Sequence, residues 1–417
     1  MNKLFLILGL FLIGCSKDTE STLDIPIPTE LSYIKNNHGN YNYNNIIISD
    51  FEKLESNFNR LPYLFNQVVY SEDIPADLTI LDYNGDGNLD LVYSDSDYNS
   101  SFGGKANRRF FKFFLGDSNG NLILDVNNDK KFIGTIHARK SIIGDWNGDG
   151  FMDMFFASPG VDGPANVQYP LNDYPILFVN DTKGSFTEYR LDSKFNMLLG
   201  YWHTVTSSDI DGDGLSEIVL IQPHSNQLGE SKIIEFTNNT LSIRDFNIRL
   251  NDVVNKYTSE SVDLNGDGFD ELILGGSDAD LKILANSPTG SFVYNYQTEE
   301  KIYLPSHKHD LLIDMVFYDL DKDGDLDIIT SRTSGYQDSS IQILRNDLTE
   351  FIDVTNQYMD ENFTFEDGQM RWIEWLYIGD FDSDGILELH TSDIRRSDRV
   401  PTTMKWEFIN NKFIKIK

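Results

Sequence analysis

Short apolar runs alternate with acidic, glycine-containing loops along most of this chain. One run, such as 78–81, leads into the loop, and a second, such as 218–221, follows it. A variable polar segment, a third run such as 341–344, a turn and a fourth run complete each unit. No helical periodicity recurs, and four short strands at a fixed period are typical of a propeller blade. The pattern therefore predicts an all-β fold, a β-propeller of four-stranded blades.

The acidic loop is a nine-residue pattern that occurs six times at a near-constant spacing. The first copy reads DYNGDGNLD from Asp82, and successive first aspartates are 54 to 64 residues apart. The later copies start at Asp145, Asp209, Asp263, Asp319 and Asp380. Regular spacing of this length is a signature of repeat architectures. Six blades are explicit. We favour seven blades in total, with residues 31–75 as a degenerate seventh blade; the alternative is a packing extension.

Within each loop, numbered from position 1 to position 9, the residue types match a cation site. Positions 1, 3 and 5 are always Asp or Asn, position 6 is always Gly, and position 9 is always Asp or Glu. Position 7 varies freely, as expected if it contributes a backbone carbonyl, and the glycine permits the positive φ of a ligand-wrapping turn. The expected ligands at positions 1, 3, 5, 7 and 9 are Asp82, Asn84, Asp86, Asn88 and Asp90; Asp145, Asn147, Asp149, Phe151 and Asp153; Asp209, Asp211, Asp213, Leu215 and Glu217; Asp263, Asn265, Asp267, Phe269 and Glu271; Asp319, Asp321, Asp323, Asp325 and Asp327; and Asp380, Asp382, Asp384, Ile386 and Glu388.

An all-oxygen ligand set of this kind favours Ca²⁺ over other cations. Zinc and copper prefer His or Cys, and Mg²⁺ takes few protein ligands. An EF-hand would need an acid at position 12, where this chain has Tyr93, Phe156 and other residues that are not acidic. Metal-free Asn-Gly turns are the simpler alternative, but they do not require carboxylates at positions 1 and 9, which would repel one another without a cation. We therefore expect up to six structural calcium ions, each between the first and second strands of a blade.

The six loops, in this strand context, resemble the FG-GAP/VCBS repeats of bacterial surface propellers and of integrin α-subunits. The similarity spans about residues 77–417. It is close at 137–140 (HARK), which lead into Asp145, and at 202–204 (WHT), which lead into Asp209. The resemblance implies the propeller fold and the calcium sites. It does not imply one activity, because the family includes adhesins, lectin-like modules, appendages of carbohydrate enzymes and polysaccharide lyases.

The N-terminus indicates export and lipid attachment. The apolar run 4–13 is too short to span a bilayer and is typical of a signal peptide, and the sequence 12–15 resembles a bacterial lipobox. The resemblance implies cleavage before Cys15 and lipid attachment to its thiol. Residues 16–20 (SKDTE) are similar to an export tag that sends some lipoproteins to the outer surface, so we expect a surface-exposed outer-membrane lipoprotein; a periplasm-facing lipoprotein and an ordinary secreted chain are the alternatives. The predicted organisation is a signal peptide at 1–14, a lipid-anchored tether at 15–30, an N-terminal segment or degenerate blade at 31–75 and the propeller at 76–417.

Charge and composition narrow the range of partners. The 417 residues include 66 acidic and 34 basic side chains, and the formal charge of −32 disfavours nucleic acid as a partner. A hydrophobic content of 40% is typical of a packed protein rather than a disordered one. Cys15 is the only cysteine, which excludes a disulfide within the chain. We expect a monomer that contacts the membrane only through its lipid anchor.

A ligand is expected on the face opposite the calcium loops. If each loop joins a first strand to a second, the residues that lead into the first strands lie on the other face, together with the long loops that leave the second strands. Aromatic rings there could stack on a sugar, and a guanidinium group could pair with a carboxylate. Alternatively, the histidines satisfy backbone groups between blades and the tryptophans belong to the core. The candidate ligand-binding residues are His137, Arg139, Trp202, His203, His309, Arg371 and Trp372.

The sequence does not present a catalytic constellation. It contains neither an HExxH motif nor a P-loop, and most of the paired acids are assigned to calcium. The predicted function is therefore that of a surface-anchored, calcium-stabilised propeller that binds a glycan or a protein, with no catalytic residues assigned. A polysaccharide-active, lyase-like enzyme with its site on the face opposite the calcium loops is the alternative. A structural subunit of an envelope complex is the third possibility.

Overall fold

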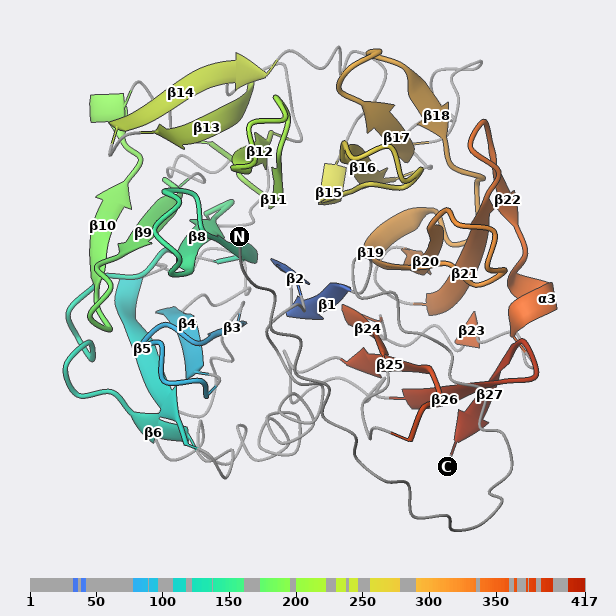
Figure 1. Ribbon diagram of the computed structural model, residues 1–417, viewed down its shortest axis with the longest axis horizontal. Helices are drawn as coiled ribbons and strands as arrows, with labels where there is room; N and C mark the ends of the chain where they lie inside the picture. The colour runs from blue at the N-terminus through green and yellow to red at the C-terminus, as the bar shows by residue number, and fades with distance from the viewer. Residues whose placement is uncertain are drawn as a thin grey trace, which may run out of the picture.

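Six four-stranded antiparallel sheets are arranged around a common centre in the computed structural model (Figure 1). In every sheet the four strands follow one another in chain order, so antiparallel neighbours are also neighbours in sequence. This arrangement confirms the predicted all-β propeller of four-stranded blades. The structure describes residues 33–36, 39–42, 78–88, 90–96, 108–117, 122–136, 138–160, 173–195, 200–222, 230–237, 240–246, 256–277, 290–334, 338–359, 364–365, 373, 375–379, 384–392 and 404–416.

The sheets are numbered 1 to 6 in chain order. Sheets 1 to 3 comprise β3 (Leu78–Leu81), β4 (Asp90–Ser96), β5 (Arg108–Gly116) and β6 (Leu122–Leu124); β7 (Lys140–Gly144), β8 (Asp153–Ala157), β9 (Ile176–Asn180) and β10 (Phe186–Arg190); and β11 (Thr204–Ser208), β12 (Glu217–Ile221), β13 (Ser231–Thr237) and β14 (Thr240–Phe246). Sheets 4 to 6 comprise β15 (Lys256–Val262), β16 (Glu271–Gly276), β17 (Phe292–Asn295) and β18 (Lys301–Tyr303); β19 (Leu311–Tyr318), β20 (Asp327–Ser334), β21 (Asp338–Asn346) and β22 (Phe351–Asp353), with β23 (Thr364–Phe365) paired to β21; and β24 (Trp375–Gly379), β25 (Glu388–Ser392), β26 (Met404–Ile409) and β27 (Lys412–Ile416). The short helices are a 3-10 turn at Ser193–Phe195 and α3 at Thr355–Tyr358.

The first strand of each sheet faces the centre, and the fourth lies at the periphery (Figure 1). Contacts run from β3 to β7, and then through β11, β15 and β19 to β24. The amino-acid composition of each strand reflects its distance from the centre. The second strand β12 reads EIVLI and is buried throughout, whereas the outer strand β14 reads TLSIRDF and is largely exposed or half-buried. A strand that is covered on both faces is apolar along its whole length, and one that is half-covered alternates.

A two-stranded hairpin occupies the centre of the disc (Figure 1). It consists of β1 (Tyr33–Asn36) and β2 (Gly39–Asn42). β1 lies against β3, β19 and β24, and β2 lies against β7 and β11. The hairpin belongs to the segment for which a degenerate blade is predicted, but in the described residues it forms a separate two-stranded sheet. Residues 43–77 lie outside the described residues, so the count of seven blades stays a prediction.

Hydrophobic clusters fill the spaces between neighbouring sheets. In the cluster shared by sheets 1 and 2, the ring of Phe111 lies 4.7 Å from that of Phe156 and 4.9 Å from that of Phe178, measured between centroids. Tyr377 of β24 belongs to the same cluster, so the last sheet also contributes to it. Each buried large side chain contributes about 1.5–3 kcal/mol relative to an exposed one. These clusters, rather than disulfides, hold the sheets together.

A buried ion pair adds a polar connection near the centre. Lys140, the first residue of β7, places its Nζ 2.7 Å from Glu260 Oε1 in β15. The two side chains are 3% and 1% exposed, and Lys140 Nζ also donates to the carbonyl of Ser259. The pair joins sheets 2 and 4, which are not neighbours in the chain. Lys140 is the last residue of the HARK segment, so this segment ends in the interior of the protein.

The N-terminal predictions concern residues that the structure does not describe. The signal peptide 1–14, Cys15 and the tether 15–30 all lie outside the described residues. Within the described ranges, no helix has both the length and the apolar character needed to cross a bilayer. The predicted domain boundaries and the lipid anchor therefore stay predictions.

Candidate metal sites and the opposite face

Each of the first five acidic loops wraps around its own first carboxylate. In loop 3, Asp209 Oδ1 accepts the N–H groups of Gly212 (2.7 Å) and Asp213 (3.2 Å), while Oδ2 accepts that of Gly214 (2.9 Å). The N–H groups at positions 5 and 6 bond to the first aspartate in loops 1, 2, 4 and 5 as well. The carboxylate at position 1 therefore lies inside a tight backbone turn.

Position 6 needs glycine because of its backbone conformation. The φ angles of the six glycines lie between +85° and +103°, as the sequence pattern predicted. A methyl group on any of them would meet no atom within 4 Å, so space alone would allow a side chain. The left-handed conformation, rather than crowding, is what makes glycine necessary there. The six glycines are Gly87, Gly150, Gly214, Gly268, Gly324 and Gly385.

Apolar residues fix the loops to the core on both sides. At position 2, Tyr83, Trp146, Leu264 and Leu320 are buried. At position 10, every residue is buried. The acidic positions between them stay near the surface, because positions 3, 4 and 5 are half-buried or exposed in the described loops. The position-10 residues are Leu91, Met154, Ile218, Leu272, Ile328 and Leu389.

The predicted ligands come together in space. One carboxylate oxygen each from Asp209, Asp211 and Asp213 lies within 4.8 Å of the others, and Asp319, Asp321 and Asp323 are arranged in the same way. Burial raises the pKa of Asp321, and the neighbouring Asp323 and Asp319 raise it further. Carboxylates at such distances repel one another unless a cation neutralises them.

The position-9 carboxylates are buried beneath the loops. Burial raises the pKa of Asp90 and of Asp153 to about 8, and acids of the same loop add to the effect. Burial likewise raises the pKa of Glu217, Glu271 and Asp327 to about 7. In the described residues, the hydrogen-bond donors to these five carboxylates are backbone N–H groups and asparagine amides, not Lys or Arg. Their negative charge therefore lacks a basic partner in those bonds.

One buried oxygen provides an independent test of whether a cation fits. Asp153 is 1% exposed; its Oδ1 accepts the N–H of Asn180 at 2.8 Å, and its Oδ2 has no hydrogen-bond partner. A buried oxygen left unbonded is costly, and a metal ion would satisfy it. The all-oxygen donor set fits calcium in number and type.

Loop 6 is described only from its fifth position. Asp384 Oδ1 accepts the N–H of Ile386 at 2.8 Å, which is the bond between positions 5 and 7 seen in the other loops. Glu388 is buried, as its counterparts are. Asp380 and Asp382 lie outside the described residues.

The face opposite the loops carries part of the predicted ligand set. Arg139 Nε donates to His203 Nε2 at 3.3 Å, so residues leading into β7 and β11 meet there. His203 is buried, and its ring stacks on Tyr201 with centroids 5.7 Å apart. Trp202 is fully buried in the cluster between sheets 2 and 3. It therefore has the core position that the sequence analysis gave as the alternative to contact with a ligand. His137, Arg371 and Trp372 lie outside the described residues.

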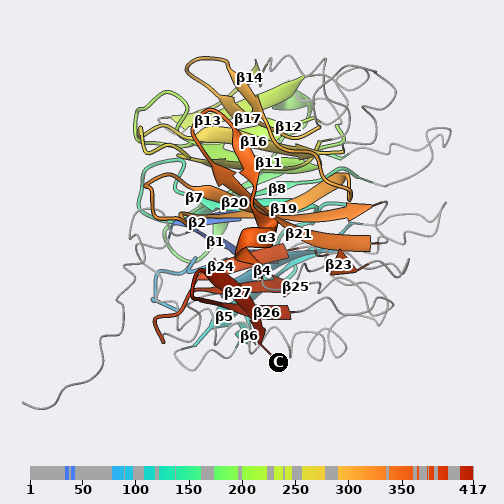
Figure 2. The same ribbon diagram turned by 90° about the vertical axis from the view of Figure 1, so that its right-hand side faces the viewer.

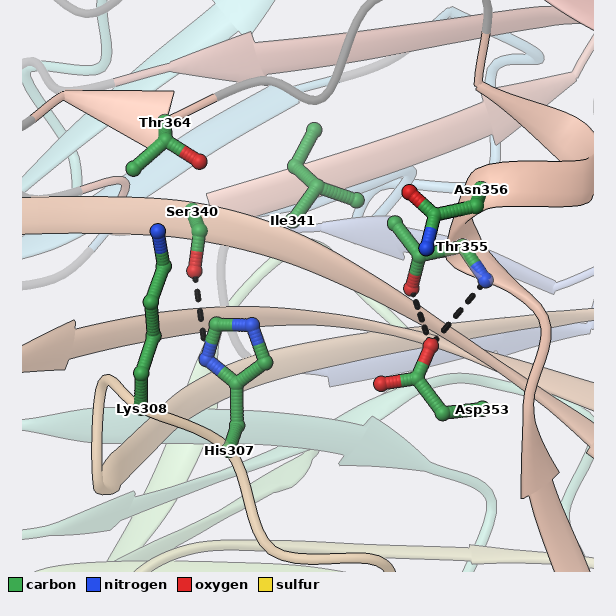
Figure 3. Close-up of a pocket in the computed structure, with 8 residues that line it drawn as sticks. All are labelled: His307, Lys308, Ser340, Ile341, Asp353, Thr355, Asn356 and Thr364. Carbon is green, nitrogen blue, oxygen red and sulfur yellow. Dashed lines mark hydrogen bonds between the residues drawn. The ribbon is translucent and has the colours of Figure 1, made fainter.

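A pocket opens on this opposite face in sheet 5 (Figure 3). It has a volume of about 210 Å³ and is lined by polar side chains from four segments. His307 and Lys308 precede β19, Ser340 lies near the start of β21, Asp353 ends β22, and Thr364 lies in β23. These are the ends of the strands remote from the acidic loop, which follows β19. The sequence pattern predicted this face but not this pocket.

The pocket's side chains are held by a hydrogen-bond network. Ser340 Oγ lies 2.9 Å from His309 Nδ1 and 3.5 Å from His307 Nδ1, and the latter nitrogen accepts the N–H of His309 at 3.1 Å. Asp353 accepts both the N–H and the hydroxyl of Thr355, at 3.0 Å and 2.6 Å (Figure 3). His309, a predicted ligand residue, is buried and therefore positions Ser340 beneath the pocket.

A buried arginine supports the floor of the network. Arg332 of β20 is 1% exposed, and its Nε donates to Gln342 Oε1 at 3.0 Å. Gln342 Nε2 donates in turn to Asp353 Oδ2 at 2.9 Å. Burial alone would raise the pKa of Asp353, but hydrogen bonds from Thr355 and Gln342 lower it below its ordinary value. Asp353 is therefore an ionised acceptor at neutral pH.

Comparison with known proteins identifies the repeats. The sequence profile described as "FG-GAP-like repeat" matches residues 145–220 and 263–330. The first match contains loops 2 and 3, and the second contains loops 4 and 5. The chain carries FG-GAP-like repeats. A solved structure entitled "Structure of Dos1 propeller" is similar at 10% identity and a TM-score of 0.41, covering 78% of this chain and 80% of that one. No curated protein matches the sequence.

Two features of these FG-GAP-like repeats were missed by the sequence reasoning. Asn180 and Asn346 each end the third strand of a sheet and bond to two acidic loops. Both precede an aspartate, and both accept a backbone N–H two residues on, from Thr182 and from Leu348, at 2.9 Å. The recurrence of Asn-Asp at the end of a third strand was the signal that could have identified them.

The pocket predicts an acid-dependent loss of stability. Burial, with nearby Arg332 and His309, lowers the pKa of His307 from 6.5 to about 4, although Asp353 opposes the shift. Because the unfolded chain takes up this proton first, stability is fully present above pH 6.5 and is lost as the pH falls towards about 4. His307→Gln should therefore lose less stability than the parent protein on acidification, measured by denaturant midpoints across this range. Equal losses in the two proteins would contradict the assignment.

Proposed function

We propose that this protein is a calcium-stabilised propeller that is displayed on the cell surface and binds a saccharide on the face opposite its acidic loops. The observation that carries the proposal is the polar pocket of sheet 5, which lies at the strand ends remote from those loops. In this proposal the two faces have separate roles: the loop face holds the fold together, and the opposite face binds the ligand.

The proposed role of calcium is structural. Each ion would join positions 1, 3, 5, 7 and 9 of one loop and thereby connect the first strand of a blade to the second. The repelling carboxylates of loops 3 and 5 and the unbonded buried oxygen of Asp153 support this role. Affinities on the order of 10⁻⁴–10⁻³ M would suffice outside the cell, as for other extracellular calcium modules.

The chemistry of the pocket favours a hydroxyl-rich ligand. Ser340, Thr355, Asn356 and Thr364 supply hydroxyl and amide groups, and Asp353 is an ionised acceptor beside them. Lys308 supplies an ammonium group at one side of the pocket (Figure 3). Sugar hydroxyls both donate and accept hydrogen bonds, and a volume of about 210 Å³ is suited to one saccharide unit rather than to an apolar side chain.

The proposal is tested by saccharide binding to the full chain in detergent, with calcium present. Calorimetric titration with a panel of neutral and uronic-acid oligosaccharides should find binding that Lys308→Ala weakens by about tenfold or more. Lys183→Ala, an exposed lysine in the turn that lies on the loop face, is the matched control and should leave affinity unchanged. Absence of binding across the panel, or equal binding by Lys308→Ala, would refute the saccharide site. Binding of a protein but of no saccharide would assign the surface to a protein partner.

A lyase is the second candidate, because His307 is a neutral imidazole beside Lys308. In such a reaction an imidazole would accept the proton next to the carboxylate of a uronic acid, and an ammonium group would neutralise that carboxylate. A carbon–carbon double bond would form as the C4–O glycosidic bond breaks, and the leaving oxygen would take a proton from water. Incubation with uronic-acid polysaccharides distinguishes the two functions. An unsaturated, ultraviolet-absorbing product that disappears with His307→Ala would establish the lyase; binding without such a product would exclude it for the substrates used.

The proposed location is the outer membrane, with Cys15 as the lipid-bearing residue. The support for this is the sequence 12–15 and the polar segment that follows it. A Cys15→Ser variant should lose membrane association in cell fractionation, because a single anchor is proposed. Protease accessibility in intact cells would separate surface exposure from a periplasmic orientation.

A further inference from the structure

Neighbouring acidic loops contact one another on the loop face. A methyl group placed on Gly85, at position 4 of loop 1, would lie 3.1 Å from Cε1 of Phe151, at position 7 of loop 2. The contact recurs between loops 2 and 3 and between loops 3 and 4, at Gly148–Leu215 (3.4 Å) and Gly212–Phe269 (3.1 Å). The side chain at position 7 of one loop therefore lies over the position-4 glycine of the preceding loop.

Asn180 connects loops 1 and 2 by hydrogen bonds. Its Nδ2 donates to the carbonyl of Tyr83 at 2.9 Å, which is position 2 of loop 1, and to that of Met152 at 3.2 Å, position 8 of loop 2. Its backbone N–H donates to Asp153 Oδ1 at 2.8 Å. Asn180 is 4% exposed, so these bonds are made in the interior. One side chain thus fixes the backbone beside predicted ligands in two loops.

Asn346 repeats this geometry between loops 4 and 5. Its Nδ2 donates to the carbonyls of Leu264 (3.1 Å) and Leu326 (3.2 Å), and its N–H donates to Asp327 Oδ1 at 2.9 Å. The N–H of Leu326 also donates directly to the carbonyl of Leu264 at 3.1 Å. Each asparagine therefore bonds to position 2 of one loop and to positions 8 and 9 of the next loop.

We infer that neighbouring loops bind calcium cooperatively, and that Asn180 and Asn346 are the positioning residues that couple loop 1 to loop 2 and loop 4 to loop 5. The inference rests on the proposed calcium binding. A cation in loop 1 orders the backbone on both sides of Tyr83, and the bond to Asn180 transmits this order to Met152 and Asp153. The second cation then binds to a loop that is already partly ordered, which lowers the entropy cost of its binding.

The test uses terbium, a luminescent stand-in for calcium, bound to the full chain. Trp146 is the only tryptophan within the six acidic loops, and it occupies position 2 of loop 2. Because the Trp146 indole also donates to Ser207 Oγ at 2.9 Å, beside loop 3, loop 3 is disabled throughout by Asp209→Ala. Luminescence that is excited through tryptophan and is lost in Trp146→Phe then reports the occupancy of loop 2. Calcium competition then gives the calcium affinity of that loop. Loop 1 is disabled by Asp86→Ala, and the measurement is made with and without Asn180→Ala, as a double-mutant cycle.

Asp86→Ala is expected to weaken calcium binding at loop 2 by about fivefold or more when Asn180 is present. In the Asn180→Ala background, Asp86→Ala should have a clearly smaller effect on the affinity of loop 2, because only the contact of Phe151 over Gly85 still joins the two loops. Asn346→Ala is the matched control: it removes the same bonds from loops 4 and 5 and should preserve the effect of Asp86→Ala on loop 2. If Asn180→Ala does not fold, Phe151→Ala, which removes only the contact over Gly85, should reduce the same effect.

Two results would overturn the coupling while leaving the calcium sites in place. One is an affinity of loop 2 that does not change when loop 1 is disabled. The other is an effect of Asp86→Ala that persists undiminished with Asn180→Ala. A complete absence of luminescence dependent on Trp146 would overturn calcium binding at loop 2 itself, and the coupling with it, so the two failures are distinguishable.

Discussion

Removal of calcium with a chelator is expected to lower the melting temperature of this protein by on the order of 10 °C. At a calcium concentration about tenfold above the dissociation constant, each bound ion stabilises the folded state by about 1.4 kcal/mol. Six such sites would contribute roughly 8 kcal/mol, because the unfolded chain does not preserve the loop geometry. The clustered carboxylates of loops 3 and 5 add to the effect, since they repel one another once the ion has gone. Differential scanning calorimetry before and after chelation measures the change.

Added calcium should restore the original melting temperature, and the same concentration of magnesium should not, because Mg²⁺ dehydrates reluctantly and uses few protein ligands. A matched pair of variants localises the effect. Asp209→Ala, at position 1 of loop 3, should reduce the calcium-dependent part of the shift. Asp245→Ala, on the outer strand of the same sheet and outside the loops, should leave it intact. A melting temperature that is independent of both chelator and calcium would contradict the assignment of the loops.

Lys140→Met is expected to destabilise the protein by about 3–5 kcal/mol. The substitution leaves Glu260, a side chain that is 1% exposed, without the ammonium group 2.7 Å away that balances its charge. An unbalanced buried carboxylate is far more costly than the loss of an exposed ion pair, for which the usual effect is below about 1 kcal/mol. Chemical denaturation with calcium held constant measures the change in the free energy of unfolding.

The control for Lys140 is an exposed pair in the same protein. Lys232 pairs with Asp245, whose side chain is 57% exposed, so Lys232→Met should change the stability by less than about 1 kcal/mol. The double variant Lys140→Met, Glu260→Leu should recover most of the stability lost in the single variant, because it removes both buried charges. A single variant as stable as the parent protein would show that the pair does not hold sheets 2 and 4 together.

Local patterns in the sequence were sufficient to predict the fold and the acidic loops. The strand-loop-strand unit depends on neighbours in the chain: Asp209 is bonded by N–H groups three to five residues on, and Gly214 is needed for its own φ of +89°. The apolar residues at positions 2 and 10 are adjacent to the acids that they position. Each of these interactions acts over a few residues, and the residue types that make it recur in all six copies of the loop, so the pattern predicts it directly.

Long-range contacts could not be predicted in this way. Lys140 and Glu260 are 120 residues apart, and nothing in the sequence around Lys140 indicates a buried partner in β15. The pocket likewise combines His307, Ser340 and Asp353, which come from separate segments of sheet 5 and are ordinary polar residues in their local sequence. The predicted ligand residues Arg139, His203 and His309 do lie towards the expected face, where Arg139 donates a hydrogen bond to His203 and His309 bonds to Ser340. The topology of the sheets, rather than any local motif, brings such groups together.

The number of calcium ions bound per chain is the most direct test of the central claim, that the acidic loops are a calcium scaffold. The full chain is equilibrated by dialysis in millimolar calcium, and bound metal is measured by mass spectrometry against protein concentration. We expect several ions per chain, up to six, and a lower number when Asp209→Ala disables loop 3. Less than one ion per chain under these conditions would contradict this claim.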